Sequence, residues 1–166
     1  MRSRVTDAEP RLRFRPIDVE QDLGLAAGHR RDSFFVSFGH EKSFDEDKYV
    51  LHLAQLLERI PGSAVFALLD GEVVGQIEAH VRPGGIGYVN LFYLVPKYRG
   101  RNLGRQLHEY ALDLLRAQRV QWIDLAVSPT NTPALRFYEK LGYRRLGLRP
   151  NAEPPVFEMR FDLASP

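Results

Sequence analysis

The segment Leu94-Val95-Pro96-Lys97-Tyr98-Arg99-Gly100-Arg101-Asn102-Leu103-Gly104-Arg105 joins an apolar strand to a helix through a basic loop. The first N–H groups of a helix have no intrahelical acceptor, and the helix dipole adds partial positive charge there, so an anion is favoured. Gly100 and Gly104 allow close approach because they carry no Cβ. Asn102 tolerates a positive φ better than other non-glycine residues. The segment therefore predicts a site for a diphosphate.

The positive charge of this segment is local. Its four basic side chains are those of Lys97, Arg99, Arg101 and Arg105, and no acidic residue lies among them. The whole chain has 23 basic and 21 acidic residues, a net charge of +2. Because the basic residues cluster in one loop and not along a face, no nucleic-acid partner is expected.

Length and composition indicate one domain. A chain of 166 residues is long enough to bury a sizeable core. We expect a flexible tail over residues 1–10 and a single domain over 11–166. The absence of cysteine excludes disulfides, thiolate metal sites and an acyl-cysteine intermediate. The histidines are scattered, so no metal site is expected. No signal peptide or membrane span is visible, which predicts a cytoplasmic protein without a membrane partner.

Hydrophobic periodicity and turn residues place the secondary structure. Strands are expected at 11–15, 64–69, 72–81, 86–95, 122–127, 143–148 and 156–163, and helices at 19–38, 43–60, 99–119 and 131–141. Asp70-Gly71 favours a tight hairpin turn. A helix between the strands at 86–95 and 122–127 implies that they run parallel. The predicted fold is α+β, with a mixed, mostly antiparallel sheet of six or seven strands and about four flanking helices.

Three segments resemble motifs of the GNAT superfamily of acyl-CoA-dependent N-acyltransferases, and the likeness covers residues 11–163. Arg99 to Gly104 is similar to the family pattern Arg/Gln-x-x-Gly-x-Gly/Ala, which holds the pyrophosphate of coenzyme A. The strand Val89 to Val95 resembles the strand whose exposed backbone pairs with pantetheine. The segment from Ser128 to Tyr143 is similar to Asn-x-x-Ala-x-x-x-Tyr-x-x-x-Gly-Phe/Tyr. Asn102 departs from the pattern, since it stands where the family usually has its first glycine.

The resemblance implies direct acetyl transfer from acetyl-CoA to a primary amine, through a tetrahedral intermediate. The amine could belong to a small molecule, a lysine or a protein N-terminus. The cofactor-binding residues that it implies are Leu94, Val95, Arg99, Gly100, Arg101, Asn102, Leu103, Gly104, Arg105, Asn131, Ala134, Phe137 and Tyr138. A non-catalytic acyl-CoA-binding sensor of the same fold is the alternative. A nucleotide phosphotransferase is disfavoured, because the loop lacks Gly-Lys-Ser/Thr.

Tyr138 is the candidate general acid. A phenol of pKa about 10 stays protonated at pH 7 and can donate to a thiolate whose thiol has a pKa of about 8.5. The alternative is that Tyr138 is a core residue beside Leu135 and Phe137. Asn131 either hydrogen-bonds the cofactor or caps a helix. Oxyanion donors are expected from a strand bulge within residues 92–94.

The general base is less defined. Ala126 occupies the position at which some relatives have a glutamate. Glu78 is a possible base, and it shares one strand face with His80 because side chains two residues apart point the same way. A solvated polar face is the alternative. The candidates on predicted strands are Glu78, His80, Asn90 and Asp124.

The acceptor is expected between the first two helices and the turn at 83–87. That region contains the aromatic residues Phe34, Phe35, Phe38 and Phe44 and the acidic residues Glu41, Asp45, Glu46 and Asp47. They could form an acidic, aromatic mouth for a cationic amine. Alternatively, the aromatic residues are core and the acidic residues begin a helix. A homodimer through the terminal strands is also considered, because the alternation of Phe157, Met159 and Phe161 fits either core or interface.

Overall fold

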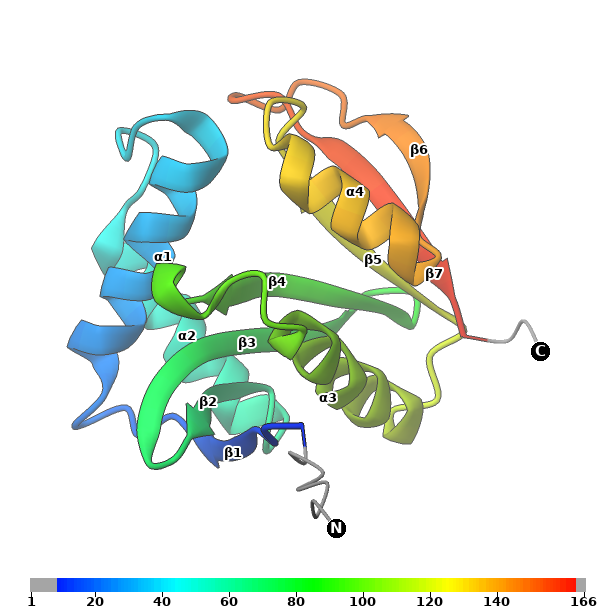
Figure 1. The fold of residues 1–166 in the computed structure, drawn as a ribbon. Coiled ribbons are helices and arrows are strands. Elements are labelled where there is room, and N and C mark those ends of the chain that lie inside the picture. The colour runs from blue at the N-terminus through cyan, green and yellow to red at the C-terminus, as the bar shows by residue number, and fades with distance from the viewer. Residues whose placement is uncertain (1–8, 164–166) are drawn as a thin grey trace, which may run out of the picture.

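The computed structural model describes residues 9–163, and most of the expected N-terminal tail lies outside this range. Seven strands form one sheet (Figure 1). They are β1 (Arg13–Pro16), β2 (Ala64–Leu69), β3 (Glu72–Arg82), β4 (Ile86–Leu94), β5 (Trp122–Val127), β6 (Arg144–Leu148) and β7 (Phe157–Asp162). The α-helices are α1 (Leu23–Phe38), α2 (Glu46–Arg59), α3 (Leu103–Ala117) and α4 (Thr132–Leu141). The α+β class and the mixed sheet predicted from the sequence are confirmed.

The strand order is β1-β2-β3-β4-β5-β7-β6, and β4 and β5 are the parallel neighbours. This pair is short: only Gly87 with Ile123 and Tyr88 with Asp124 are in register. Beyond these residues β4 and β5 diverge, with α4 over the β5 side of the gap (Figure 1). The part of β4 that follows Tyr88 therefore has no ladder partner on its β5 side among the described residues.

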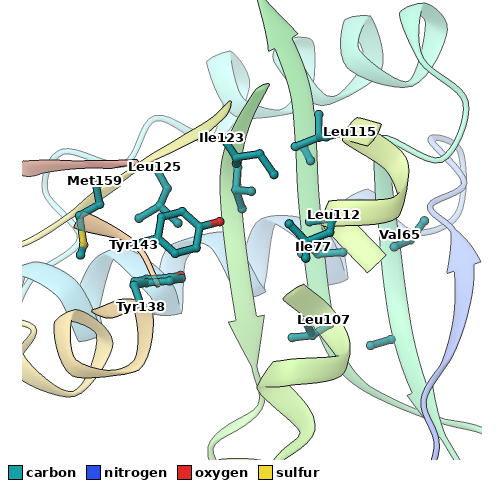
Figure 2. Packing of buried hydrophobic residues seen from close by; sticks show 14 of the residues in the cluster. Val65, Ile77, Leu107, Leu112, Leu115, Ile123, Leu125, Tyr138, Tyr143 and Met159 are labelled. Atoms are coloured by element: carbon teal, nitrogen blue, oxygen red, sulfur yellow. The ribbon is translucent and has the colours of Figure 1, made fainter. Parts of the chain in front are cut away.

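Hydrophobic clusters lie on both faces of the sheet, because alternate residues of β2 point in opposite directions. Val65 packs with α3, and Phe66 packs with α2. Figure 2 shows the larger cluster, in which leucines of α3 lie against Ile77. The same cluster includes the fully buried Met159, while Phe157 and Phe161 are half-buried against it. Packing on both faces therefore holds the sheet, including the ends of β4 and β5 that diverge.

Local signals explain most boundaries. Asp70 and Gly71 both have positive φ, at 50° and 84°, as the predicted tight turn requires. Asp45 caps α2 by accepting a hydrogen bond from Lys48 N at 3.1 Å. Gly62, with φ 81°, follows the end of this helix.

Three predicted helix starts are wrong by several residues, and α2 begins at Glu46 and not at residue 43 because Asp45 is its cap. α1 begins at Leu23 and not at residue 19, because Asp18 and Asp22 side chains bind backbone N–H groups in a turn before it. α3 begins at Leu103 and not at residue 99, because a short 3₁₀ helix (Pro96–Tyr98) and a non-helical turn precede it. The 3₁₀ helix and the turn after it place residues 99–102 as a loop in front of the α3 N-terminus.

Candidate active site

A cavity of about 980 Å³ opens where β4 and β5 diverge. Its walls come from α1, the end of β4, the loop before α3 and one side of α4. The lining residues are Ser33, Val36, Ser37, Phe92, Tyr93, Leu94, Arg99, Gly100, Asn102, Gly104, Arg105, Asn131, Pro133, Ala134, Phe137, Tyr138, Lys140 and Leu141. One end is therefore basic and glycine-containing, and Phe92 and Phe137 lie beside Gly104 at that end.

The loop before α3 has the backbone shape that the sequence predicts. Gly100 has φ 72°, and Asn102 is left-handed with φ 62° and ψ 11°. Gly104 has a different reason to be glycine, because a Cβ there would lie 3.0 Å from Cζ of Phe137. The first turn of α3 contains no acidic residue, so its free N–H groups face the basic end of the cavity without a competing carboxylate of that turn.

The bulge in β4 lies at Asn90 and not within residues 92–94, so that expectation is wrong. Glu78 pairs with Leu91 and Ala79 pairs with Val89, which leaves Asn90 as the extra residue. Tertiary contacts hold it there. The Asn90 carbonyl accepts a hydrogen bond from Arg30 Nη1 at 2.7 Å, and its side chain contacts His52 Nε2 at 2.6 Å. Neither contact is evident from a strand pattern.

A second cavity of about 460 Å³ adjoins the first, and both are lined by Ser33 and Ser37 of α1. It is formed by α1, the β4 bulge, the end of β5 and the loop between β6 and β7. The turn at 83–87 does not line it, contrary to expectation. The other lining residues are Arg30, Phe34, Phe38, Ser43, Tyr88, Val89, Asn90, Ala126, Ser128, Arg149, Pro150, Asn151, Ala152, Glu153, Pro154 and Val156.

Comparison with known proteins identifies the family of this chain. The model of the acetyltransferase (GNAT) family matches residues 27–143. The chain belongs to the GNAT family. Among curated relatives, NAA20, the catalytic subunit of the N-terminal acetyltransferase B complex of Arabidopsis thaliana, is 31% identical over 79% of this chain and 70% of its own length. Mycothiol acetyltransferase of Acidothermus cellulolyticus is 35% identical over 52% of this chain. The chain spans only 31% of the length of that relative.

Solved GNAT structures share the fold. Ard1 from Thermoplasma volcanium matches with a TM-score of 0.75 and 20% identity, over 93% of this chain and 99% of that one. The paiA N-acetyltransferase from Thermoplasma acidophilum, solved in complex with coenzyme A, matches with a TM-score of 0.75 and 18% identity, over 92% and 99%. No helix in the described part of this chain is both long and apolar enough to cross a membrane.

The structure places most of the cofactor residues implied by the GNAT resemblance in the first cavity. The residues that line it are Leu94, Arg99, Gly100, Asn102, Gly104, Arg105, Asn131, Ala134, Phe137 and Tyr138. Three others do not. Val95 N donates to Val74 O at 2.8 Å, Leu103 is buried in the core, and Arg101 lies over the Tyr98 ring. Sequence reasoning missed Ser33 and Val36, because the face of α1 that meets β4 carries no motif.

The basic loop is less charged than its sequence suggests. Lys97 pairs with Glu72 at 3.5 Å, and Arg99 pairs with Asp32 at 3.5 Å. These acidic partners come from β3 and α1, so a reading of the loop alone does not reveal them. Both pairs are exposed, and exposed pairs of this kind contribute little to stability. Their basic members are thus able to exchange a carboxylate for a phosphate.

Tyr138 is packed in the core and also lines the first cavity, so the two positions considered from the sequence are compatible. It is 8% exposed and packs edge-on against Phe92 and Tyr143, with ring centroids 5.8 Å and 5.5 Å away. It also lines the first cavity. Burial raises the pKa of Tyr138 above its ordinary value. The phenol therefore stays protonated throughout the physiological range.

Asn131 caps α4 and also lines the first cavity. Its side-chain oxygen accepts a hydrogen bond from Ala134 N at 3.3 Å, which confirms that it caps α4. It also lines the first cavity, on the same side as Ala134. The cap fixes the start of α4 and so fixes the wall that carries Tyr138.

Glu78, the possible base, is 1% exposed and lines neither cavity. Its carboxylate accepts hydrogen bonds from Tyr49 and from Gln76 Nε2, the latter at 2.8 Å. Gln76 also contacts His29 Nδ1 at 2.9 Å. The solvated face considered from the sequence is wrong, because α1 and α2 cover it. As a base, Glu78 would require a water or another side chain between it and the amine.

The other three candidates for the base are Asp124, His80 and Asn90. Asp124 accepts two hydrogen bonds from Arg160, at 2.7 and 2.8 Å. Burial, together with a smaller contribution from the neighbouring His52, lowers the pKa of His80 to about 4. Asn90 is the one of the four that lines the second cavity. The bulge at Asn90 therefore lines the second cavity, while Glu78, His80 and Asp124 line neither cavity.

The acidic mouth is not formed. Asp45 caps α2, and Glu46 in the first turn of this helix pairs with Arg31. Of the four phenylalanines, Phe34 and Phe38 line the second cavity, Phe44 packs against the smaller core and Phe35 is exposed. The helix N-terminus therefore explains the acidic residues around position 46.

Proposed function

We propose that this protein transfers the acetyl group of acetyl-CoA to a primary amine. The observation that carries the proposal is the large cavity between diverging β4 and β5, with a left-handed Asn102 before α3 at one end and Tyr138 in its wall. GNAT membership and the coenzyme A complex of a protein with the same fold support it.

The residues of the first cavity fit coenzyme A. The free N–H groups at the start of α3, with Arg99 and Arg105, suit a pyrophosphate. The β4 edge beyond Tyr88 has backbone groups available for an extended amide-containing arm. Bound there, acetyl-CoA would supply an activated acyl group on a thiol leaving group.

The residues of this chain would assist the transfer in two ways. Tyr138 would hold a proton beside the departing sulfur, because it lines the cavity and its hydroxyl stays protonated. The N–H groups of β4 near the bulge would stabilise negative charge that develops on the acyl oxygen. The amine would approach from the second cavity, since Asn90 and Ala126 line that side of the strand gap.

A calorimetric titration with acetyl-CoA, with ATP as the control ligand, tests the cofactor half of the proposal. We expect micromolar binding of acetyl-CoA and none of ATP. Release of free thiol in the presence of an amine panel tests the transfer. Absence of acetyl-CoA binding would refute the proposal. Binding without thiol release from any amine would favour the alternative, a non-catalytic sensor.

A further inference from the structure

The charge of the second cavity indicates what kind of amine it accepts. Its ionisable lining residues are Arg30 on α1 and Arg149 and Glu153 in the loop between β6 and β7. The charge of Arg149 is paired, because its Nε donates to Glu158 at 2.6 Å, and its Nη2 donates to Tyr88 at 3.0 Å. Glu153 is exposed at the loop surface. Of the two lining arginines, Arg30 is the one without a carboxylate partner among the described residues.

Arg30 is half-buried, and no carboxylate of residues 9–163 lies within 4.0 Å of it. Its Nη1 donates to the Asn90 carbonyl, and its guanidinium lies 5.1 Å from the centroid of the Phe34 ring. A guanidinium has five N–H donors, so the contact with Asn90 leaves several for a ligand. The hydroxyls of Ser37 and Ser43, which also line the cavity, can add further donors.

We propose that the acceptor is a small primary amine that also carries an anionic group, a carboxylate or a phosphonate, and that Arg30 binds this group. The inference rests on the proposed acetyl transfer. The size of the cavity, about 460 Å³, favours a small molecule. Because Arg30 contacts the bulged residue of β4, the anion is held close to the strand gap, so only a few bonds separate it from the amine.

The charge of Arg30 also discriminates between acceptors by their own charge. The anionic group of the acceptor offsets the charge of Arg30 for binding. An amine without such a group would have no compensation for approaching Arg30.

Matched amines test the inference on the wild-type protein. The pairs are β-alanine with β-alaninamide, and 2-aminoethylphosphonate with ethanolamine, with cadaverine as a dication. The measurement is kcat/KM from thiol release, referred to the neutral-amine fraction of each compound. We expect the anionic member of a pair to be preferred on the order of tenfold or more, as for a hydrogen bond to a charged group. The pair with the larger preference identifies the anion as carboxylate or phosphonate.

Arg30→Gln should reduce that preference on the order of tenfold, mainly through KM. Arg31→Gln is the matched control, because Arg31 is the next residue of α1, pairs with Glu46 and lines neither cavity. It should leave the preference unchanged. Arg30→Lys, which keeps the charge, should retain part of it.

Two results would overturn the inference: a wild-type protein that prefers the neutral amines or cadaverine, or an equal loss for both members of a pair in Arg30→Gln. The second result would mean that Arg30 only supports the Asn90 carbonyl. Calorimetric binding of β-alanine and 2-aminoethylphosphonate to protein saturated with coenzyme A gives a readout without turnover. Failure of the proposed acetyl transfer is distinguished by anion binding that depends on Arg30 but yields no thiol release.

Discussion

Gly104→Ala tests how tightly the cofactor cavity is built. A Cβ at this position would lie 3.0 Å from Cζ and 3.2 Å from Cε2 of Phe137, and 3.7 Å from Cε1 of Phe92. The first two separations are shorter than most real Cβ contacts, so the Phe137 ring must move by a few tenths of an ångström. Phe137 lines the cavity, so the ring has space to move only into the volume that we assign to acetyl-CoA.

Two opposing contributions determine the stability of the variant. Alanine is favoured over glycine by roughly 0.5–1 kcal/mol in a helix interior, and the gain is smaller for Gly104, the second residue of α3. Overpacking usually costs about 1–3 kcal/mol, and the open side of Phe137 places this case at the lower end. We therefore expect the free energy of unfolding to change by less than about 1 kcal/mol. The affinity for acetyl-CoA should fall on the order of tenfold, which corresponds to about 1.4 kcal/mol.

Urea unfolding and calorimetric titration with acetyl-CoA measure the two effects separately. Gly28→Ala is the matched control, because Gly28 lies in α1 and its Cβ would have no neighbour within 4 Å. It should show the helix-propensity gain without a loss of affinity. Gly104→Ala combined with Phe137→Leu should recover part of the affinity in a double-mutant cycle. Wild-type affinity in Gly104→Ala, or an equal loss in the Phe137→Leu background, would refute the packing argument.

Tyr138→Phe should retain acetyl-CoA affinity but lose turnover on the order of a hundredfold, as for a lost general acid; unchanged turnover in a steady-state assay would assign Tyr138 to the core alone. Asn102→Val should destabilise the fold by about 1–2 kcal/mol in urea unfolding, and Asn102→Gly should not, because φ at this position is 62°. Burial lowers the pKa of His108 to about 4. Stability should therefore be complete above pH 6.5 and fall towards pH 4, and His108→Gln should remove up to about 3 kcal/mol of this dependence in unfolding measured against pH.

The sequence predicts the strands and the parallel β4–β5 pair because these depend on local pattern. Asp70-Gly71 determines its hairpin turn within two residues, and the length of the 99–119 segment requires a crossover. The start of α3 is not predicted, because Gly100 and Asn102 are compatible with both a loop and a first helical turn. The bulge at Asn90 is not predicted either. It depends on Arg30 and His52, which come from two helices far away in the sequence.

The two cavities of the candidate site also differ in how far apart their residues lie in the sequence. The basic end of the first cavity comes from one continuous segment that ends at Arg105, and backbone conformation within that segment creates it. A motif can therefore indicate it. The second cavity is assembled from α1, the β4 bulge, the end of β5 and the loop that begins at Arg149, and no two of these are adjacent in sequence. Its charge depends on which acidic residue each arginine meets.

This difference explains why the acidic residues near position 46 suggested a cationic acceptor. Counted along the chain, Glu41 and Asp45 to Asp47 lie close to the aromatic residues of α1 and outweigh Arg30. In the fold, Glu46 forms an ion pair with Arg31, and Asp45 caps the N-terminus of α2. Neither residue lines the second cavity. Arg30 faces the cavity with no carboxylate partner among the described residues. The charge of the proposed acceptor cavity is thus set by pairing in three dimensions, and it differs from the acidic mouth that was one alternative from the chain.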